Sequence, residues 1–337
     1  MDHLSAKIRD SFPAKRIVIG GDLVADQFLH GTIARVSREA PVFILRHDDT
    51  DTRAGAAANA AVNIASLGAT PVLVGVVGDD ENGRLLLESL NSAGVDCRHV
   101  IAEPSRKTTT KVRVLAGQHY AARQQVIRID FEETAEISSH LRERLLANFA
   151  GAAEGADALI VSDYNYGVAD QGLFAAASQI SCRAAIPLLI DSRFRLGSFL
   201  NATAATPNQE EAEQLIGGEL TPENCEELRE RLGVRSLLVT RGNKGMLLFQ
   251  RGAEPVILPA VGSTEPVDVT GAGDTVIAAF TLGLASGLSP AEAAEIANHA
   301  GGIVVMKKGT SSASADELIE SVKVHGAAAN VLESTAR

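Results

Sequence analysis

Hydrophobic residues follow two patterns along the chain: short uninterrupted runs, and longer segments in which they recur every three or four positions. Short runs bounded by Gly, Pro or polar residues predict buried strands, and the longer segments predict helices that pack by one face. Strands are predicted at residues 16–20, 71–77, 158–161, 187–190 and 236–239, and helices at 55–67, 80–93, 137–150, near 173, from 208, from 222, at 272–286, 290–306 and 315–323. Strands separated by helices indicate βαβ units, so we expect an α/β fold with a mostly parallel sheet.

Other segments carry alternating or β-branched residues together with charges, which predicts strands with one face toward solvent. They lie at residues 27–36, 40–47, 108–116 and 123–131. We expect them to form a small second sheet, inserted in part between the first strand and the first helix. Among their polar positions are Lys111, Arg113, Arg123 and Arg128. These cations are candidates for holding a substrate phosphate, or they form an ordinary solvated face. Segments 245–250 and 254–259 predict antiparallel additions to the main sheet.

Composition and charge narrow the class of function. The chain has 337 residues, 45% of them hydrophobic and 22% charged, as in an ordinary globular protein. Its net charge of −11 argues against nucleic-acid partners and anionic membranes and favours small-molecule chemistry. The three cysteines contain no CxxC pair, so we expect neither a disulfide framework nor a zinc site, and a cytoplasmic location. We also expect no signal peptide and no membrane span.

The segment from Asp268 to Asp274 carries the most informative motif. Small residues at Gly271, Ala272 and Gly273 allow backbone amides at a helix N-terminus to approach an anion. Asp274 then places a carboxylate beside that anion, which is costly unless the carboxylate accepts a hydroxyl proton. The alternative is that Asp274 only complements the helix dipole.

Further candidates are individually ambiguous. Asn208 and Glu211 have the spacing to organise waters around a divalent metal, but the same spacing makes a helix capping box. Asp22 follows a predicted strand at the edge where α/β sheets bind ligands, or it belongs to a simple turn. Residues 240–245 form a nucleotide-phosphate loop or, more simply, a hairpin turn. The sequence contains no GxxxxGK[ST], GxGxxG, HxxxH or GxSxG motif.

Taken in this order, these segments resemble the ribokinase/phosphofructokinase-B (PfkB) family of carbohydrate kinases over nearly the whole chain. The carrying signatures are Gly55–Asn59, with glycines at 68 and 78, and Asp268–Asp274. Segments 35–42, 63–68, 110–113 and 125–133 are most similar to the heptose 7-phosphate kinases, whose kinase domain is often joined to an adenylyltransferase. We expect a stand-alone kinase here.

The resemblance implies a three-layer, doubly wound sheet in a single domain spanning residues 1–337, with lid strands inserted at about 27–47 and 108–131. It implies ATP and Mg²⁺ as cofactors, leaves a monovalent cation open, and suggests a homodimer formed through the lid. The implied catalytic base is Asp274, with the amides of Gly271, Ala272 and Gly273 as an anion hole. Asn208 and Glu211 would orient magnesium waters. The remaining implied contacts are Asp22, Gly55 and Asn59 to sugar hydroxyls, Lys111, Arg113 and Arg128 to a substrate phosphate, Asp191, Thr240, Arg241 and Gly242 to the nucleotide, and Asn298 to adenine.

The chain departs from the family pattern at three positions. Arg193 and Tyr166 stand where heptose kinases carry lysines, and Ala56 stands where a second glycine is usual. The expected activity is ATP-dependent phosphorylation of a sugar or sugar phosphate, with D-glycero-D-manno-heptose 7-phosphate at its anomeric hydroxyl as the first candidate. Another sugar or a nucleoside is the alternative acceptor, and a non-catalytic sugar- or nucleotide-binding protein is the second alternative.

Overall fold

A large sheet, sheet A, lies at the centre of the protein in a computed structural model that describes residues 2–117, 123–133, 135–263 and 265–335. Within these residues its strand order is β13-β12-β11-β10-β9-β8-β1-β4-β5. Strands β11 to β5 of this order run parallel, whereas β12 and β13 are antiparallel additions. The strands are β1 (Arg16–Gly21), β4 (Thr70–Gly78), β5 (Asp96–Glu103), β8 (Ala158–Asp163), β9 (Leu188–Ser192), β10 (Ala204–Ala205), β11 (Ser236–Thr240), β12 (Met246–Gln250) and β13 (Val256–Leu258).

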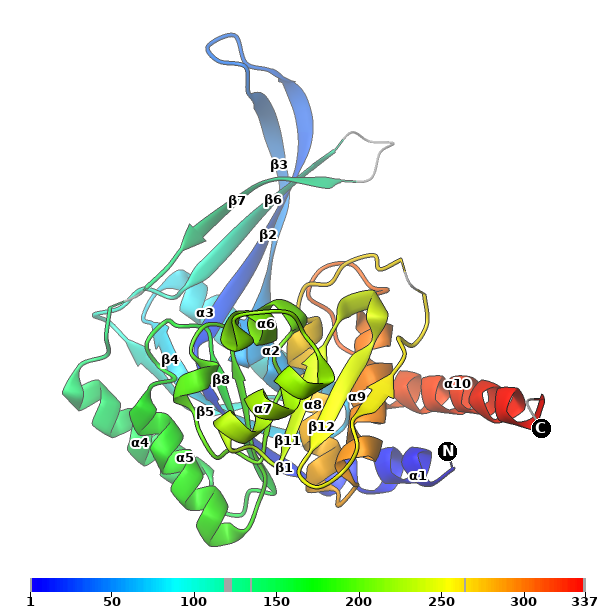
Figure 1. The fold of residues 1–337 in the computed structure, drawn as a ribbon. Coiled ribbons are helices and arrows are strands. Elements are labelled where there is room, and N and C mark those ends of the chain that lie inside the picture. Colours follow the sequence, from blue (N-terminus) through cyan, green and yellow to red (C-terminus); the bar gives the residue numbers. More distant parts are fainter. Residues whose placement is uncertain (1, 118–122, 134, 264, 336–337) are drawn as a thin grey trace.

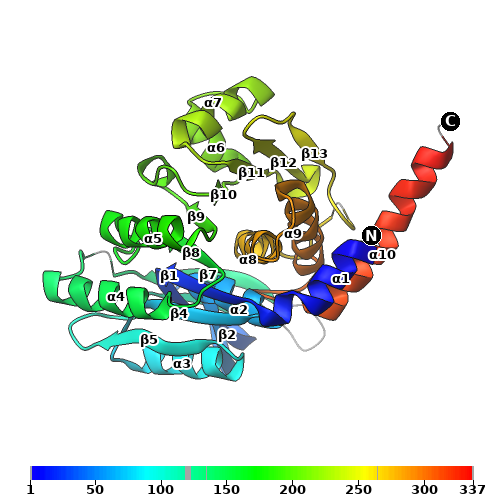
Figure 2. The same ribbon diagram turned by 90° about the horizontal axis from the view of Figure 1, so that it is seen from below.

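Helices cover both faces of sheet A, because successive residues of a strand point to opposite faces and both faces here are hydrophobic. Ile17 and Ile19 of β1 pack into one buried cluster, and Val18 between them packs into the other. Figure 2 shows α4 and α5 on one side of the strands and α8 and α9 on the other. The helices are α1 (Asp2–Asp10), α2 (Ala57–Ser66), α3 (Glu81–Ser92), α4 (Ser139–Ala152), α5 (Gln171–Ala184), α6 (Gln209–Ile216), α7 (Pro222–Leu232), α8 (Ala272–Ala285), α9 (Pro290–Val304) and α10 (Ala315–Thr335), with 3-10 turns at Phe12–Ala14, Leu196–Ser198 and Gly242–Lys244.

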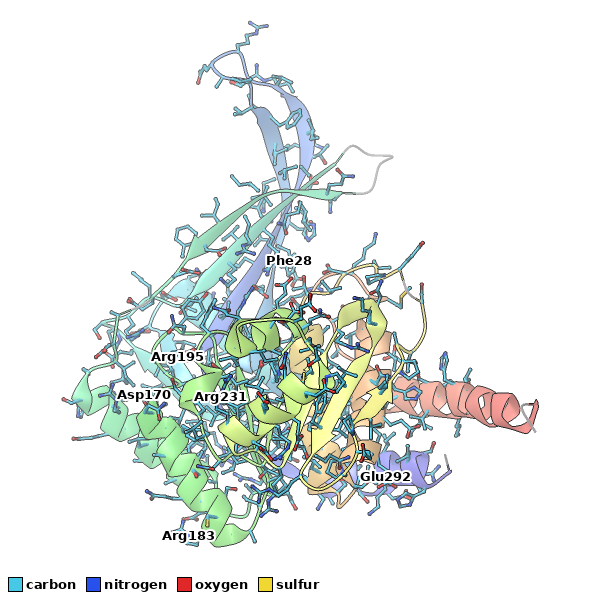
Figure 3. All side chains as sticks on the ribbon, in the orientation of Figure 1. Phe28, Asp170, Arg183, Arg195, Arg231 and Glu292 are labelled. Atoms are coloured by element: carbon cyan, nitrogen blue, oxygen red, sulfur yellow. The ribbon has the colours of Figure 1, made fainter. Side chains whose placement is uncertain are left out.

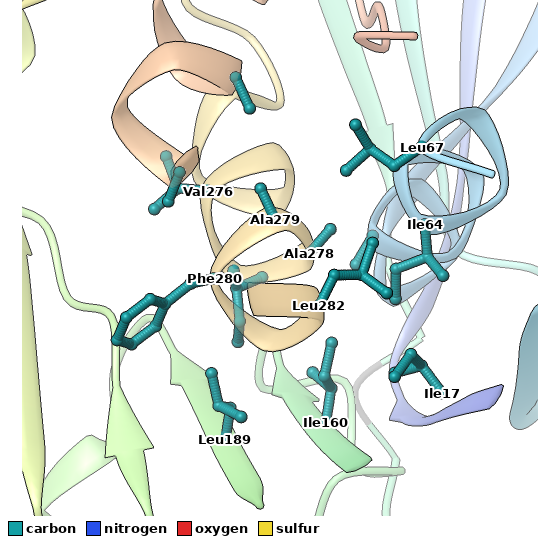
Figure 4. Packing of buried hydrophobic residues seen from close by; sticks show 14 of the residues in the cluster. Ile17, Ile64, Leu67, Ile160, Leu189, Val276, Ala278, Ala279, Phe280 and Leu282 are labelled. Carbon is teal, nitrogen blue, oxygen red and sulfur yellow. The ribbon is translucent and has the colours of Figure 1, made fainter. Parts of the chain in front are cut away.

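Helix α8 is the central helix of its layer. Figure 4 shows its Ala278 and Leu282 beside Ile64 of α2, with Phe280 directed toward the strands. All four side chains are fully buried. Because small and large hydrophobic residues interlock along this contact, α8 is held firmly against α2.

A smaller sheet, sheet B, projects from the body of the protein (Figure 1). Its order is β3-β2-β6-β7, formed by β2 (Leu23–Val36), β3 (Phe43–Ala56), β6 (Thr110–Gly117) and β7 (Gln124–Phe131). The β2–β3 pair is a long antiparallel ribbon, β6 pairs with β2 in parallel, and β7 pairs with β6 antiparallel. The expected strands are present, but β2 and β3 are longer than the sequence pattern predicted.

The predicted fold class, a three-layer α/β fold with a small second sheet, is confirmed. The sequence analysis missed α1, β5 and the short β10, and the helix predicted from residue 55 begins at Ala57. Among the described residues, no helix combines the length and hydrophobicity needed to cross a bilayer.

Candidate active site

Asp274 lies in the first turn of α8 and is only 4% exposed. Its Oδ2 accepts a hydrogen bond of 2.7 Å from Nδ2 of Asn59, and its Oδ1 accepts one of 2.8 Å from the hydroxyl of Tyr164. Burial raises the pKa of Asp274 to about 6, although both hydrogen bonds oppose the rise. A carboxylate that is ionised at neutral pH, with a pKa close to that pH, is suited to act as a general base.

The glycine at the start of α8 is required by the packing against α2. Gly271 has φ of +78°, and a Cβ there would lie 2.5 Å from Nδ2 of Asn59. No side chain of a described residue caps this helix N-terminus. Of the three amides predicted to form an anion hole, that of Ala272 donates to the carbonyl oxygen of Val269 at 3.2 Å.

A cavity of about 760 Å³ opens beside the same helix end. Its volume is within the range of small-molecule and cofactor sites. Of the residues predicted to contact the nucleotide, Thr240, Arg241, Gly242 and Asn298 line it, and Asp191 does not. Asn208 of the predicted magnesium site and Ala272 and Gly273 of the predicted anion hole also line it. The side chain of Asn298 donates to the carbonyl oxygen of Pro259 at 2.7 Å, which fixes it in the cavity wall.

Asp22 lies where the strand order of sheet A reverses direction, between β1 and β8. Such switch points place the ends of two neighbouring strands around a crevice. Asp22 is fully buried, and its carboxylate accepts backbone hydrogen bonds from Tyr164, Tyr166 and Val168 at 2.8, 3.1 and 2.9 Å. Its observed contacts therefore hold the segment after β8, and its contact with a sugar stays a prediction.

Asn208 and Glu211, the pair predicted to orient magnesium waters, lie close enough to Asp191 for their region to be strongly acidic. Burial raises the pKa of Asp191 well above its usual value, and the nearby charges of Asp274 and Glu211 raise it further. Asn208 and Glu211 do form the capping box, with each side chain bonded to the other's backbone amide at 2.9 Å. Among the described residues no His, Cys, Asp or Glu side chains form a ready-made metal site. Carboxylates that repel one another nevertheless suit Mg²⁺ held through water.

Arg193 lies beside this acidic group. Its guanidinium stacks on the ring of Phe194 at 5.7 Å, and its charge opposes the rise in pKa of both Asp191 and Glu211. A cation is therefore retained at this position, where heptose kinases carry a lysine. At the other departure, the ring of Tyr166 lies 5.4 Å from Nζ of Lys111 in sheet B.

The face of sheet B that meets the body alternates in charge. Two cross-strand rows run across it, Asp51–Phe28–Arg113–Arg128 and Arg53–Asp26–Lys111–Asp130. Arg113 pairs with Asp26 at 2.6 Å, Lys111 with Asp130 at 3.2 Å, and Arg128 with Asp130 at 2.8 Å. The three cations predicted to hold a substrate phosphate are thus already paired, so a phosphate must compete with these carboxylates.

Phe28, Arg53 and Asp26 join this face to residues 309–310, and none of the three was predicted as a site residue from the sequence. Figure 3 shows Phe28 where sheet B meets the body, and the guanidinium groups of Arg53 and Arg113 lie 5.2 and 5.4 Å from its ring. Arg53 also donates to the carbonyl oxygen of Thr310 at 3.2 Å. Gly55 approaches so closely that a Cβ there would lie 2.9 Å from Asp26 Oδ2. The sequence signal for Asp26 was its position just after the first strand.

A buried base, a glycine-rich helix N-terminus and an adjoining cavity on an α/β sheet are the parts that a kinase of small molecules requires. Comparison with known proteins agrees. The model of the pfkB family of carbohydrate kinases matches residues 32–317. The bifunctional protein HldE of Trichlorobacter lovleyi is 38% identical over 315 residues, which is 92% of this chain and 63% of that protein. The chain therefore spans less than two thirds of the length of this relative.

Two solved structures show the same fold at low identity. Ribokinase of Arabidopsis thaliana, complexed with ribose and ATP, has a TM-score of 0.68 and 22% identity, covering 92% of this chain and 98% of its own. Phosphofructokinase-2 of Escherichia coli, in complex with potassium, has a TM-score of 0.72 and 20% identity, covering 91% and 97%. The chain belongs to the pfkB family of carbohydrate kinases, which transfer phosphate to a hydroxyl group of a sugar.

Proposed function

We propose that the protein transfers the γ-phosphoryl group of ATP to a sugar phosphate, with D-glycero-D-manno-heptose 7-phosphate at its anomeric hydroxyl as the first acceptor to test. The observation that carries the proposal is the position of Asp274 between the cavity and sheet B. The nucleotide would occupy the cavity, with its phosphates at the N-terminus of α8, where the helix dipole and backbone amides favour negative charge. The acceptor would lie on the side of Asp274 that faces Asn59 and sheet B.

In this arrangement Asp274 accepts the proton of the attacking hydroxyl, and its pKa of about 6 leaves it mostly ionised at neutral pH. Mg²⁺ supplies charge neutralisation for the phosphates when bound, and Asn208, Glu211 and Asp191 would hold it through water. Arg193 would add a positive charge beside the transferred group. Catalysis then rests on positioning and charge rather than on a covalent intermediate.

The choice of a heptose phosphate is supported by the 38% identity to the HldE protein. A phosphorylated acceptor would displace carboxylates from Lys111, Arg113 or Arg128. Because these cations are already paired, an unphosphorylated sugar is the alternative acceptor that the observed pairing favours.

We further propose that two copies associate through sheet B. Ile127, Ile129 and Phe131 of β7 lie on the face opposite the charged rows and are 53%, 44% and 57% exposed. Apolar neighbours on β6 and β2, Val112, Val114 and Leu29, share this face by register. Sheet B stands clear of the body, so a second copy of the same face is its natural cover (Figure 1).

The test is ADP release from Mg-ATP with purified protein against heptose 7-phosphate, hexose phosphates, free sugars and nucleosides. We expect turnover with one class of acceptor, and a loss of about 10²-fold or more in Asp274→Asn, as for removal of a general base. The proposal fails if no acceptor is turned over while ATP still raises the melting temperature. Turnover of free sugars alone would keep the kinase and reject the phosphorylated acceptor.

A further inference from the structure

The hydroxyl of Tyr164 contacts the same carboxylate that we propose as the base. Tyr164 follows directly after β8, and its hydroxyl donates to Oδ1 of Asp274 at 2.8 Å, while Asn59 from α2 donates to Oδ2. Each oxygen of Asp274 thus has one protein donor. Two donors from separate elements fix the plane of the carboxylate and leave its remaining lone pairs for the acceptor hydroxyl.

Tyr164 is itself fixed by Asp22. The Asp22 carboxylate accepts from the amides of Tyr164, Tyr166 and Val168, so one buried side chain sets the path of the chain just after β8. A carboxylate that accepts several backbone bonds holds such a loop strongly, because each amide would otherwise be buried without a partner. We infer that Tyr164 is a positioning residue for the catalytic carboxylate of Asp274, and that Asp22 acts on Asp274 through Tyr164. This inference rests on the proposed function.

Loss of the Tyr164 hydroxyl has a specific consequence for the chemistry. A donor to a carboxylate stabilises the ionised form, so Tyr164 lowers the pKa of Asp274 against the opposing effect of burial. In Tyr164→Phe the pKa of Asp274 would therefore rise, and Asp274 would stay protonated up to a higher pH than in the wild type. Without its second donor the carboxylate would also rotate more freely, which lowers kcat more than it raises KM.

The first experiment measures kcat/KM against pH for the wild type, Tyr164→Phe and Tyr166→Phe. Tyr166 lies two residues further along the chain, and its hydroxyl donates to Glu132 at 2.9 Å. Tyr166→Phe therefore also removes a tyrosine hydroxyl, but one that bonds to Glu132 and not to Asp274. We expect the acid limb of Tyr164→Phe to move up by about one pH unit, the size of one charged hydrogen bond. The acid limb of Tyr166→Phe should stay in place, whatever its rate. An unmoved limb in Tyr164→Phe overturns the inference.

A second experiment needs no substrate. The chain has three tyrosines and no tryptophan, so alkaline titration of tyrosinate absorbance is easily followed. Burial and the charge of Asp274 raise the pKa of Tyr164 well above its usual value. Asp274→Asn removes this charge but not the burial, so Tyr164 should titrate at a lower pH than in the wild type while near-ultraviolet circular dichroism still reports a folded protein. Identical titrations of the wild type and Asp274→Asn would contradict the contact. If no acceptor is turned over, the proposed function fails while this titration still decides the contact.

Discussion

Asp274 shows how a single buried carboxyl group links activity to stability. Its pKa in the folded protein, about 6, is above the value of 3.8 for an unperturbed aspartate. Protonation therefore favours the folded state, and this stabilisation is complete below the unfolded pKa and is lost as the pH rises through 6. Keeping Asp274 ionised in the folded protein thus lowers the free energy of unfolding by up to about 3 kcal/mol.

We predict that Asp274→Asn raises the free energy of unfolding relative to the wild type, and that the difference grows by about 1 kcal/mol between about pH 5 and about pH 8. Urea unfolding at the two pH values measures it. Asp268→Asn is a matched control, because the Asp268 carboxylate accepts from the amides of Thr270 and Gly309 and its pKa is lowered. That variant should be less stable than the wild type at both pH values. A pH-independent difference for Asp274→Asn would contradict the prediction.

At the scale of elements, the junction of β3 and α2 carries backbone strain at Ala56, where the family usually has a second glycine. Ala56 has φ of +56° and ψ of −135°, a combination that glycine adopts readily and other residues avoid. The residue is held there because its neighbour Ala57 donates to the carbonyl oxygen of Asp22 at 3.1 Å, which joins the start of α2 to the end of β1. The methyl group noted as a departure from the family is thus placed on a strained backbone.

We predict that Ala56→Gly stabilises the protein by about 1 kcal/mol, because relief of 1–3 kcal/mol of strain exceeds the entropy lost by glycine. Ala58→Gly is the control, since Ala58 is buried within α2 and its replacement should destabilise by about 1 kcal/mol or more. Thermal unfolding of both variants gives the comparison. Equal destabilisation by both would show that Ala56 is unstrained.

The elements predicted correctly from sequence are those with a complete hydrophobic pattern. The strands at the centre of sheet A are buried on both faces, so each appears as an uninterrupted apolar run. β5 lies at the edge of the sheet and reads DCRHVIAE, with Ile101 as its one buried residue, and α1 shows little more than Leu4 and Ile8 one turn apart. Neither pattern distinguishes the element from a polar loop.

For the candidate site, sequence reasoning found the residues that occur in a local motif and missed those that only the fold brings together. Asp274 and its glycines are adjacent in sequence, and their environment follows from one helix start. Tyr164 lies 110 residues from Asp274, and Asp26 lies 284 residues from Thr310, with which it is in contact. Such pairs depend on the order of strands in the two sheets. The order was not predictable from periodicity, because the pattern gives the elements but not their neighbours.

At the scale of the whole molecule, sheet B has two faces with different chemistry. One face carries alternating charges and meets residues 309–310, which ties the acceptor side of the site to the position of this sheet. The other face is apolar along β7. A sheet that covers a site by one face and binds a second copy by the other would couple the shape of the site to the oligomeric state.

We predict that the wild type sediments as a dimer and that Ile127→Asp weakens the dimer at least about 100-fold, since a carboxylate buried in an apolar contact costs several kcal/mol. Sedimentation velocity over a range of concentrations measures the dissociation constant. Ile257→Asp is the matched control: Ile257 lies on the edge strand β13 of sheet A and is 70% exposed, more than Ile127. It should leave the dimer intact. A wild type that is monomeric throughout, or equal weakening by both substitutions, would show that the apolar face of sheet B has another role.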